Sequence, residues 1–388
     1  MRWSLLLLLL PLPVLSLHAA IIQVEVDGRD DGDGSRRRPF RSPVAGLRAA
    51  RILKATRPSE PIILEFGRGR HELEEPLHLT PEDSGLTLRA RVPGSAVLSG
   101  GVRLRGWQRD PTRPGLWTTT IPEVAAGRWY FHQLFVDGRR AQRARTPNEG
   151  FFHATGRLGE QSPITLPFRP GDIDPRWTKL PDARVILLMK WTDLQLPIRG
   201  VDTNAHVAQL PGGPRPYWMD EPDARYWVKN VPEALDVPGE WYLDRTSGRV
   251  SYLAPKGIDP NRATVVAPRL RELVRVEGDV ARGRPVVGVT FSGLTFSDAD
   301  YEVPADGMIS PQSAVPIRGG SGPRMRWDVG SRTAPSRTWE AMASIWAAGP
   351  SVGRWSATRS GILARVGSGS VSRAIVSRRR WTPAIPMR

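Results

Sequence analysis

Two aspartates, Asp298 and Asp300, follow a short apolar run that ends at Phe296, and they are candidates for acid chemistry. A glycosidase needs two carboxyl groups about 5–5.5 Å apart to retain the anomeric configuration, or about 6.5–9.5 Å apart to invert it. The end of a strand is a natural place for such groups. However, residues two apart on one short loop make a poor pair across a sugar. We therefore favour solvated loop acids, with the same expectation for Glu302 and Asp306, and the catalytic residues stay unknown.

Metal and cofactor chemistry has little support in the sequence. His132 and His153 have no partner at metal-ligand spacing, so we expect structural roles for both. The acidic glycine loop over 27–34 lacks the terminal glutamate of an EF-hand, which favours a plain turn over a calcium loop. The chain has no Gly-x-Ser-x-Gly, P-loop or dinucleotide motif, and no cysteine. We therefore expect no cofactor and no metal.

Positive charge is concentrated at one end of the 388-residue chain. Lys and Arg total 55 against 39 Asp and Glu, which gives a formal charge of +16. Residues 311–388 hold 13 Arg but only Asp328 and Glu340 as acids, a net charge of +11. The remainder is ordinary in charge, so we expect no nucleic-acid partner. A hydrophobic fraction of 40% and a charged fraction of 24% are typical of a globular protein with two or three domains.

The N-terminus has the form of a secretory signal peptide. Arg2 precedes an apolar run from Leu5 to Leu17, and Ala19-Ala20 supplies small residues at a cleavage position. The run is shorter than the roughly 20 residues that span a bilayer. We therefore expect a signal peptide over residues 1–20 and a secreted protein, extracellular or periplasmic, without a membrane span.

Short strands separated by turn residues dominate residues 21–105. Gly and Pro bound five runs with strand character, at 21–26, 62–66, 77–79, 86–88 and 96–98. One helix is expected to begin with Ser42 as N-cap and Pro43 at N1, and to bury a stripe of Ala45, Ala49, Ile52 and Leu53. Closely spaced strands after one amphipathic helix favour a β-solenoid whose open end the helix caps.

Residues 106–258 are predicted to form an inserted β domain. Eight Trp fall here, and we expect them to be mostly core, with one or two lining a groove. Asp137-Gly138 predicts a type I′ hairpin, and Gly248 ends the turn of a second hairpin. Short strands return at 264–266, 273–276, 286–291 and 294–296, which we assign to resumed solenoid coils over 259–317.

Several sequence blocks resemble glycoside hydrolase family 141 and its relatives. The most specific are QLFVDGRRA at 133–141, RARTPN at 143–148 and GEWYLD at 239–244. The opening glycine loop at 28–34 is similar to the start of many bacterial right-handed parallel β-helix proteins. The resemblance covers about residues 21–317. It implies an all-β fold: a right-handed parallel β-helix of the pectate-lyase type, with a short N-terminal capping helix and an inserted β domain.

The resemblance implies hydrolysis of plant cell-wall polysaccharides, with catalytic carboxylates on coils well past the insertion. This chain should reach those coils only after about residue 317, where the pattern stops. The leading interpretation is therefore a monomeric protein that binds a polysaccharide or oligosaccharide but lacks the hydrolytic coils and is inactive. One alternative is a non-catalytic polysaccharide-binding or cell-surface protein that uses the aromatic residues of the insertion. Another is an active hydrolase or lyase that uses Asp298 or Asp300.

The segment 318–388 reads as an atypical basic tail. It shows neither strand alternation nor a helical stripe, and it is rich in Arg, Ser, Trp, Gly and Pro. Reading the codons of 338–346 in the next frame gives a glycine-punctuated apolar-polar pattern that is typical of a β-helix coil. We favour a frameshift near 317–326, and a genuine disordered tail is the alternative.

Overall fold

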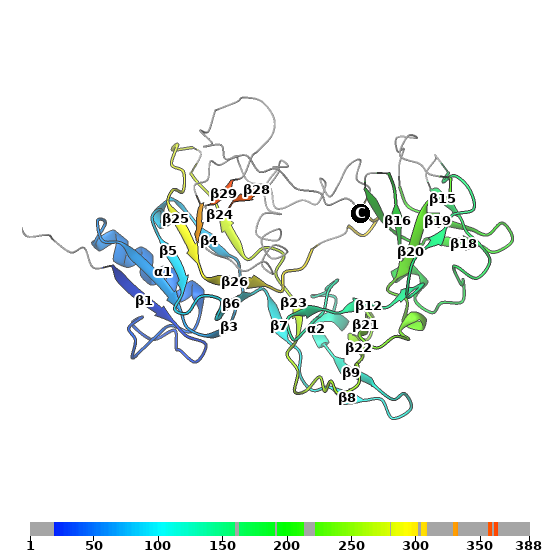
Figure 1. Cartoon of the computed structure of the whole chain (residues 1–388), viewed down its shortest axis with the longest axis horizontal. Coiled ribbons are helices and arrows are strands. Elements are labelled where there is room, and N and C mark those ends of the chain that lie inside the picture. The colour runs from blue at the N-terminus through cyan, green and yellow to red at the C-terminus, as the bar shows by residue number, and fades with distance from the viewer. Residues whose placement is uncertain are drawn as a thin grey trace, which may run out of the picture.

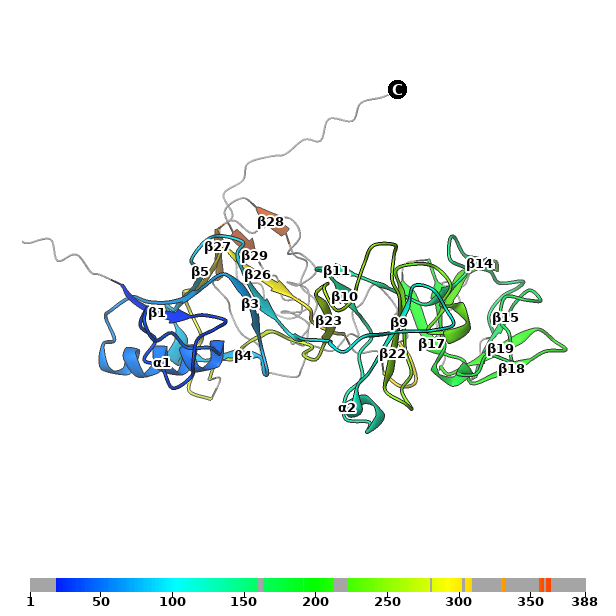
Figure 2. The same ribbon diagram turned by 90° about the horizontal axis from the view of Figure 1, so that it is seen from below.

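The computed structural model describes residues 19–159, 163–190, 192–212, 222–279, 281–301 and 304–308, with the backbone of 329–332, 356–358 and 361–363. The predicted signal peptide lies outside these residues apart from Ala19 and Ala20. The described chain is mostly strand, so the predicted all-β class is confirmed, and it extends from parallel sheets at one end to antiparallel sheets at the other (Figures 1 and 2). Within it, no helix is both long and apolar enough to cross a membrane.

Three parallel sheets contain the strands predicted within 21–105 and those predicted at 273–276, 286–291 and 294–296, whereas the strand predicted at 264–266 as part of a resumed coil lies in an antiparallel sheet. The orders of the three parallel sheets are β1-β2-β5-β25-β27, β26-β6-β3 and β24-β4. The strands are β1 (Ala20–Val24), β2 (Ile62–Phe66), β3 (Gly69–Glu72), β4 (Leu77–Leu79), β5 (Thr87–Ala90), β6 (Ala96–Ser99), β24 (Val274–Val276), β25 (Val289–Ser292), β26 (Leu294–Ser297) and β27 (Val329–Arg332).

The chain visits these sheets in turn and stacks equivalent side chains in register. Strands β2, β3 and β4 lie in the first, second and third sheets, and the chain then returns to the first sheet with β5. In the first sheet, Ile22, Leu64, Leu88 and Phe291 are successive partners. Leu64 and Leu88 are fully buried. Because parallel strands place such side chains directly over one another, successive strands share one continuous core.

Helix α1 (Pro43–Thr56) begins where predicted and packs on this core. The Ser42 side chain accepts a hydrogen bond from an amide of the first turn at 3.1 Å. The helix buries Pro43, Gly46, Leu47 and Ala50. Ile52, predicted in the buried stripe, is 69% exposed. The other three predicted residues, Ala45, Ala49 and Leu53, are partly buried against the core. Gly46 approaches β2 closely, since a Cβ there would lie 2.7 Å from the Leu64 side chain.

Residues 101–268 form sheets that are mostly antiparallel. One has the order β11-β10-β23-β7, and a second has the order β12-β21-β22-β9-β8. Their strands are β7 (Gly101–Arg103), β8 (Gln108–Arg109), β9 (Leu116–Thr120), β10 (Phe135–Val136), β11 (Arg139–Arg140), β12 (Gln142–Arg143), β21 (Glu240–Leu243), β22 (Arg249–Leu253) and β23 (Val265–Pro268). The predicted type I′ turn is confirmed, because Asp137 and Gly138 have φ of 48° and 74°.

Two further sheets lie at the far end of the molecule (Figure 1). The larger has the order β13-β20-β16-β17 with β14 beside β20, and the smaller has the order β15-β19-β18. Their strands are β13 (Arg145–Thr146), β14 (Phe152–His153), β15 (Ile164–Pro167), β16 (Arg184–Leu188), β17 (Asp193–Pro197), β18 (Gly200–Asp202), β19 (Val207–Leu210) and β20 (Arg225–Lys229). Short helices occur at α2 (Pro122–Ala125), Pro81–Asp83, Leu180–Asp182 and Pro232–Ala234.

The chain leaves the parallel sheets and returns to them at one point. The carbonyl oxygen of Gly100 accepts hydrogen bonds from the amides of both Arg269 and Leu270, each at 2.8 Å. Residues 101–268 are therefore looped out between β6 and β24, and the parallel sheets continue across the interruption.

The described core divides into separate apolar clusters. The largest lies under the parallel sheets and helix α1, and two further large clusters and a small one lie within 101–268. Trp107, Trp117 and Trp241 are buried in the third of these, as expected for core tryptophans. Trp191 and Trp218 lie outside the described residues.

The described residues of the predicted tail, 318–388, form short strands. Within it, β27 pairs in parallel with β25, and β28 (Ser356–Thr358) pairs with β29 (Gly361–Leu363). The expectation of disorder is therefore corrected for these residues, since the backbone of β27 adds one more strand to an open parallel edge. The rest of 318–388 lies outside the described residues.

Candidate functional site

Asp298 is a buried structural carboxylate. It is 3% exposed, forms an ion pair with Arg70, and accepts a hydrogen bond from the Ser99 hydroxyl at 2.6 Å. The prediction of a solvated loop acid is therefore wrong for Asp298. Parallel stacking explains the difference: β3, β6 and β26 lie side by side, so Ser99 at the end of β6 and the side chain of Arg70 on β3 contact the residue that follows β26.

Asp300 is also buried, at 7% exposure, but it faces a different part of the chain. Its carboxylate accepts hydrogen bonds from the backbone amide of His132 at 3.1 Å and contacts the His132 ring nitrogen Nδ1 at 3.3 Å. The neighbouring Gln133 side chain donates to the carbonyl of Ala299 at 3.1 Å. The solvated prediction is wrong here too, because residues 130–134 cover this loop. Asp298 and Asp300 thus have separate partners.

The His132 ring lies between two tyrosines. Its centroid is 5.2 Å from that of Tyr130 and 6.0 Å from that of Tyr301. Burial lowers the pKa of His132, and the Asp300 carboxylate opposes that shift. The ring is therefore neutral near pH 7, and Asp300 orients it through Nδ1. Among the described residues Nε2 has no hydrogen-bond partner, and the His132 side chain is 26% exposed.

Lys229, at the end of β20, continues this polar cluster. Its Nζ donates to the Tyr301 hydroxyl at 3.4 Å and to Oε1 of Gln195, on β17, at 3.1 Å. Burial, with the Arg143 charge next, lowers the pKa of Lys229 to about 8. Burial also raises the pKa of Tyr301, which stays a neutral hydroxyl.

Arg143, on β12, is held by neutral and aromatic groups. Its guanidinium carbon lies 5.5 Å from the ring centre of Tyr130 and 5.0 Å from that of Trp241. Its Nε donates to the side-chain oxygen of Asn230 at 2.8 Å, next to Lys229 in the chain. The Asp300 site is defined here as Tyr130, His132, Arg143, Lys229, Asp300 and Tyr301.

Tertiary structure brings the Asp300 site together from distant elements. After Tyr301 the chain crosses to the far sheet, where Met308 and Gln195 exchange two backbone hydrogen bonds of 2.8 and 3.1 Å. Asp306, on this crossing, is a solvated acid as predicted, with a side chain that is 85% exposed and paired to Arg199. Glu302 lies outside the described residues.

The sequence indicated Asp300 and noted His132, but it missed the other members of the Asp300 site. Tyr130, Arg143, Lys229 and Tyr301 carry no motif spacing. The one signal was for two of them: Tyr130 lies just before the block at 133–141 that resembles family 141, and Arg143 begins the block at 143–148. His153 lies on β14, paired with Arg225, and does not belong to this site.

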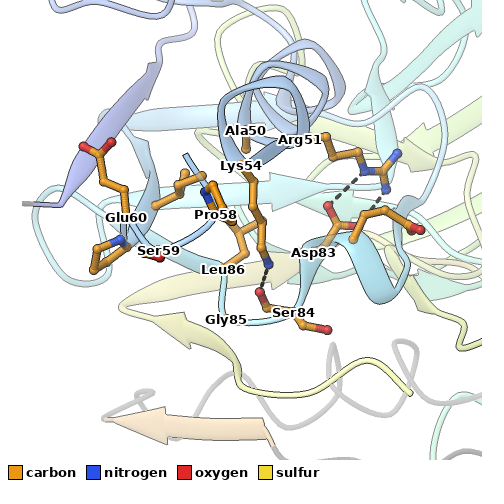
Figure 3. A pocket seen from close by; sticks show the side chains of 13 residues that line it. Ala50, Arg51, Lys54, Pro58, Ser59, Glu60, Asp83, Ser84, Gly85 and Leu86 are labelled. Carbon is orange, nitrogen blue, oxygen red and sulfur yellow. Dashed lines mark hydrogen bonds and ion pairs between the residues drawn. The ribbon is translucent and has the colours of Figure 1, made fainter. Parts of the chain in front are cut away.

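A cavity of about 270 Å³ lies elsewhere, between α1 and residues 58–62 and 82–86 (Figure 3). Two of its basic side chains have partners within the chain: Arg51 pairs with Asp83 at 2.7 Å, and Lys54 donates to the carbonyl of Ser84. These bonds fix the capping helix to the first strands. The residues that line the cavity include no aromatic ring and no histidine, so the cavity is a weaker candidate than the Asp300 site.

The glycine loop at 27–34 satisfies its own carboxylates. Asp30 accepts hydrogen bonds from the amides of Arg41 and Ser42 at 2.9 and 2.8 Å, and Asp31 pairs with Arg29 at 3.0 Å. Across the part of the chain that the structure describes, no group of three or more His, Asp or Glu is placed to hold a metal ion.

Comparison with known proteins defines the class of fold. No family model and no curated protein matches the chain. A solved structure described as "Glycoside hydrolase" matches with a TM-score of 0.64 and 26% identity, over 82% of this chain and 55% of that one. This chain therefore has a glycoside hydrolase-like fold.

A second solved structure, "The complex structure of XylC with xylose", matches with 12% identity over 84% of this chain and 46% of that one. Its TM-score of 0.33 is too low to support a shared fold. The chain spans about half the length of each of these two structures, by 55% and 46% coverage.

Proposed function

We propose that this chain is a carbohydrate-active protein and that the Asp300 site binds its saccharide. The observation that carries the proposal is the oriented His132 ring, with Asp300 on Nδ1 and Nε2 unpartnered within the described residues. Tyr130 and Tyr301 flank it, and aromatic rings beside hydrogen-bonding groups suit a sugar, which offers both apolar C–H faces and hydroxyls. The glycoside hydrolase-like fold supports the same class of ligand.

The proposed architecture is a right-handed parallel β-helix similar to family 141, interrupted by an insertion domain. In-register parallel strands that visit three sheets in turn support the helix, and crossovers between parallel strands are right-handed in almost all proteins. The paired amides on Gly100 support an insertion near 101–268. Secretion through residues 1–20, a monomeric state and a frameshift after about 317 remain part of this proposal.

The proposed activity of the described chain is binding without hydrolysis. Glycoside hydrolysis needs two carboxyl groups facing one glycosidic bond. Asp298 is committed to Arg70 and Ser99, while Asp300 is committed to His132. Because the two acids have separate partners, we expect no hydrolysis by them, and hydrolysis is the competing outcome of the test.

Binding and hydrolysis are measured on the same purified full chain. Affinity electrophoresis through a panel of soluble plant cell-wall polysaccharides should show retardation in at least one, without release of reducing sugar. His132→Ala should weaken the retained interaction by about fivefold, because a hydrogen bond to a ligand contributes about 1 kcal/mol. Asp306→Ala, an exposed control, should bind like the wild type.

Two results would overturn the proposal: no polysaccharide in the panel is bound, or binding occurs and His132→Ala leaves it unchanged. Release of reducing sugar that depends on Asp298 or Asp300 would establish the hydrolase alternative instead. Circular dichroism of each variant should match the wild type, so that a loss of binding is not a loss of fold.

A further inference from the structure

A row of basic residues crosses one face of the far sheet. Lys229 on β20 is the direct partner of Arg145 on β13 and of Arg184 on β16. Directly opposite residues in antiparallel strands point to the same face. The other face carries the apolar core, where Val185 and Val228 are fully buried. The three cations therefore lie side by side on the face opposite the apolar core, and Lys229 is the member of this row that belongs to the Asp300 site.

Neutral groups are the hydrogen-bond partners of these three cations and of the neighbouring Arg143. Arg145 donates to the carbonyls of Pro147 and Gly150, and Arg184 donates to the carbonyls of Pro181 and Ala183. Lys229 donates to Gln195 and Tyr301, while Arg143 donates to Asn230 and Tyr130. Among the described residues, no carboxylate forms an ion pair with any of the four.

The nearby carboxylates attract these cations but form their hydrogen bonds with other groups. Glu240, whose charge opposes the lowering of the Arg145 pKa, accepts from the backbone amides of Arg145, Asp236 and Val237 at 3.2–3.3 Å. Asp300 is held by His132, and Asp193 accepts from the Gln195 side chain at 2.9 Å. Asp182 faces Arg245 at 3.5 Å. Like charges directly opposite in a sheet are destabilising, and partly buried charges are normally paired. This row is therefore an arrangement that an external anion would stabilise.

We propose that the Asp300 site recognises an anionic saccharide, whose acidic group binds Lys229 and Arg184 while the sugar ring contacts His132 and the tyrosines. This inference rests on the proposed carbohydrate function and names its ligand class. Arginine and lysine bind carboxylates and sulfates through charge-assisted hydrogen bonds, which are about twice as strong as neutral ones. A uronic acid carboxylate and a sulfate ester share this chemistry, and the experiment separates them.

The test compares polymers that differ in charge, using the full chain. Binding is measured for polygalacturonate, for its fully methyl-esterified form, for a sulfated galactan and for neutral xylan, all at the same ionic strength. We expect one acidic polymer to bind at least about tenfold more tightly than the neutral ones, as one charge-assisted contact would require. Whichever acidic polymer binds identifies the acidic group.

Variants separate the site from the basic tail. Lys229→Gln and Arg184→Gln should each remove most of the preference for the acidic polymer. Lys256→Gln and Arg262→Gln delete equally basic but exposed side chains and should not. The 13 Arg of residues 311–388 are present in every variant, so any binding of polyanions by that segment cancels from the comparison.

Each failure has a distinct signature. Equal binding of acidic and neutral polymers, with His132→Ala still harmful, would overturn the anionic preference and leave the proposed function standing. An acidic preference that survives both Lys229→Gln and Arg184→Gln would also overturn it. If no polymer binds, the proposed function itself fails.

Discussion

The carboxylate of Asp300 accepts a hydrogen bond from the backbone amide of His132 and contacts its ring nitrogen, although 168 residues separate the two. This pair joins the loop after the parallel strand β26 to the segment that precedes the antiparallel strand β10. It therefore links the parallel sheets to the antiparallel sheets, and it also orients the imidazole of the Asp300 site.

Substituting Asp300 should change the titration of His132. The negative charge of Asp300 favours the imidazolium form, so Asp300→Asn should lower the pKa of His132 further. An NMR titration of the histidine ring protons measures this directly, and Asp306→Asn should leave the His132 titration unchanged. A higher pKa in Asp300→Asn would contradict the contact.

Asp298 should matter for stability. Asp298→Ala leaves Arg70 without its carboxylate and removes the acceptor of the Ser99 hydroxyl. Removing one partner of a buried ion pair typically costs about 3 kcal/mol, so the free energy of unfolding measured in urea should fall by about that amount. Asp306→Ala, which breaks an exposed pair, should change the free energy of unfolding by less than about 1 kcal/mol. Equal effects of the two variants would show that Asp298 is not the structural link inferred here.

Two glycines with almost the same backbone conformation should differ in tolerance to alanine. Gly248 and Gly127 have φ of 70° and 69°. A Cβ on Gly248 would lie 2.3 Å from the carbonyl oxygen of Ile121, whereas nothing lies within 4 Å of one on Gly127. Gly127→Ala should destabilise by about 1 kcal/mol from conformation alone, and Gly248→Ala by about 3 kcal/mol. Chemical denaturation that gave equal losses would refute the predicted contact.

Stability should rise with pH in the window set by Lys229. The pKa of Lys229 is lowered to about 8 in the folded chain, against about 10.4 for an unperturbed lysine. Between these values the unfolded chain binds a proton that the folded chain does not, so the free energy of unfolding increases with pH. The difference between wild type and Lys229→Gln isolates this contribution from the tyrosines, which both proteins share. A flat difference over about pH 8 to 10.5 would contradict the shift.

Local pattern was enough to predict many of the elements. Strand β2 occupies the predicted residues, Ser42 caps the helix, and Asp137-Gly138 forms the predicted turn, because periodicity, capping and turn chemistry depend on near neighbours in sequence. Strand β3 was missed because Gly-Arg-His-Glu has no apolar alternation. Its pairing with β6 comes from its position beside an existing strand.

The sequence alone determined that this is a strand-rich chain with a capping helix. It also showed a change in amino-acid composition after the first strands and a resemblance to glycoside hydrolases. Only the tertiary structure decided the roles of its acids. Asp298 and Asp300 are two residues apart and look alike in sequence, yet one is bound by Arg70 and the other by His132. The physical reason is that burial and charge pairing depend on which distant strands meet at a residue, and no local spacing records that.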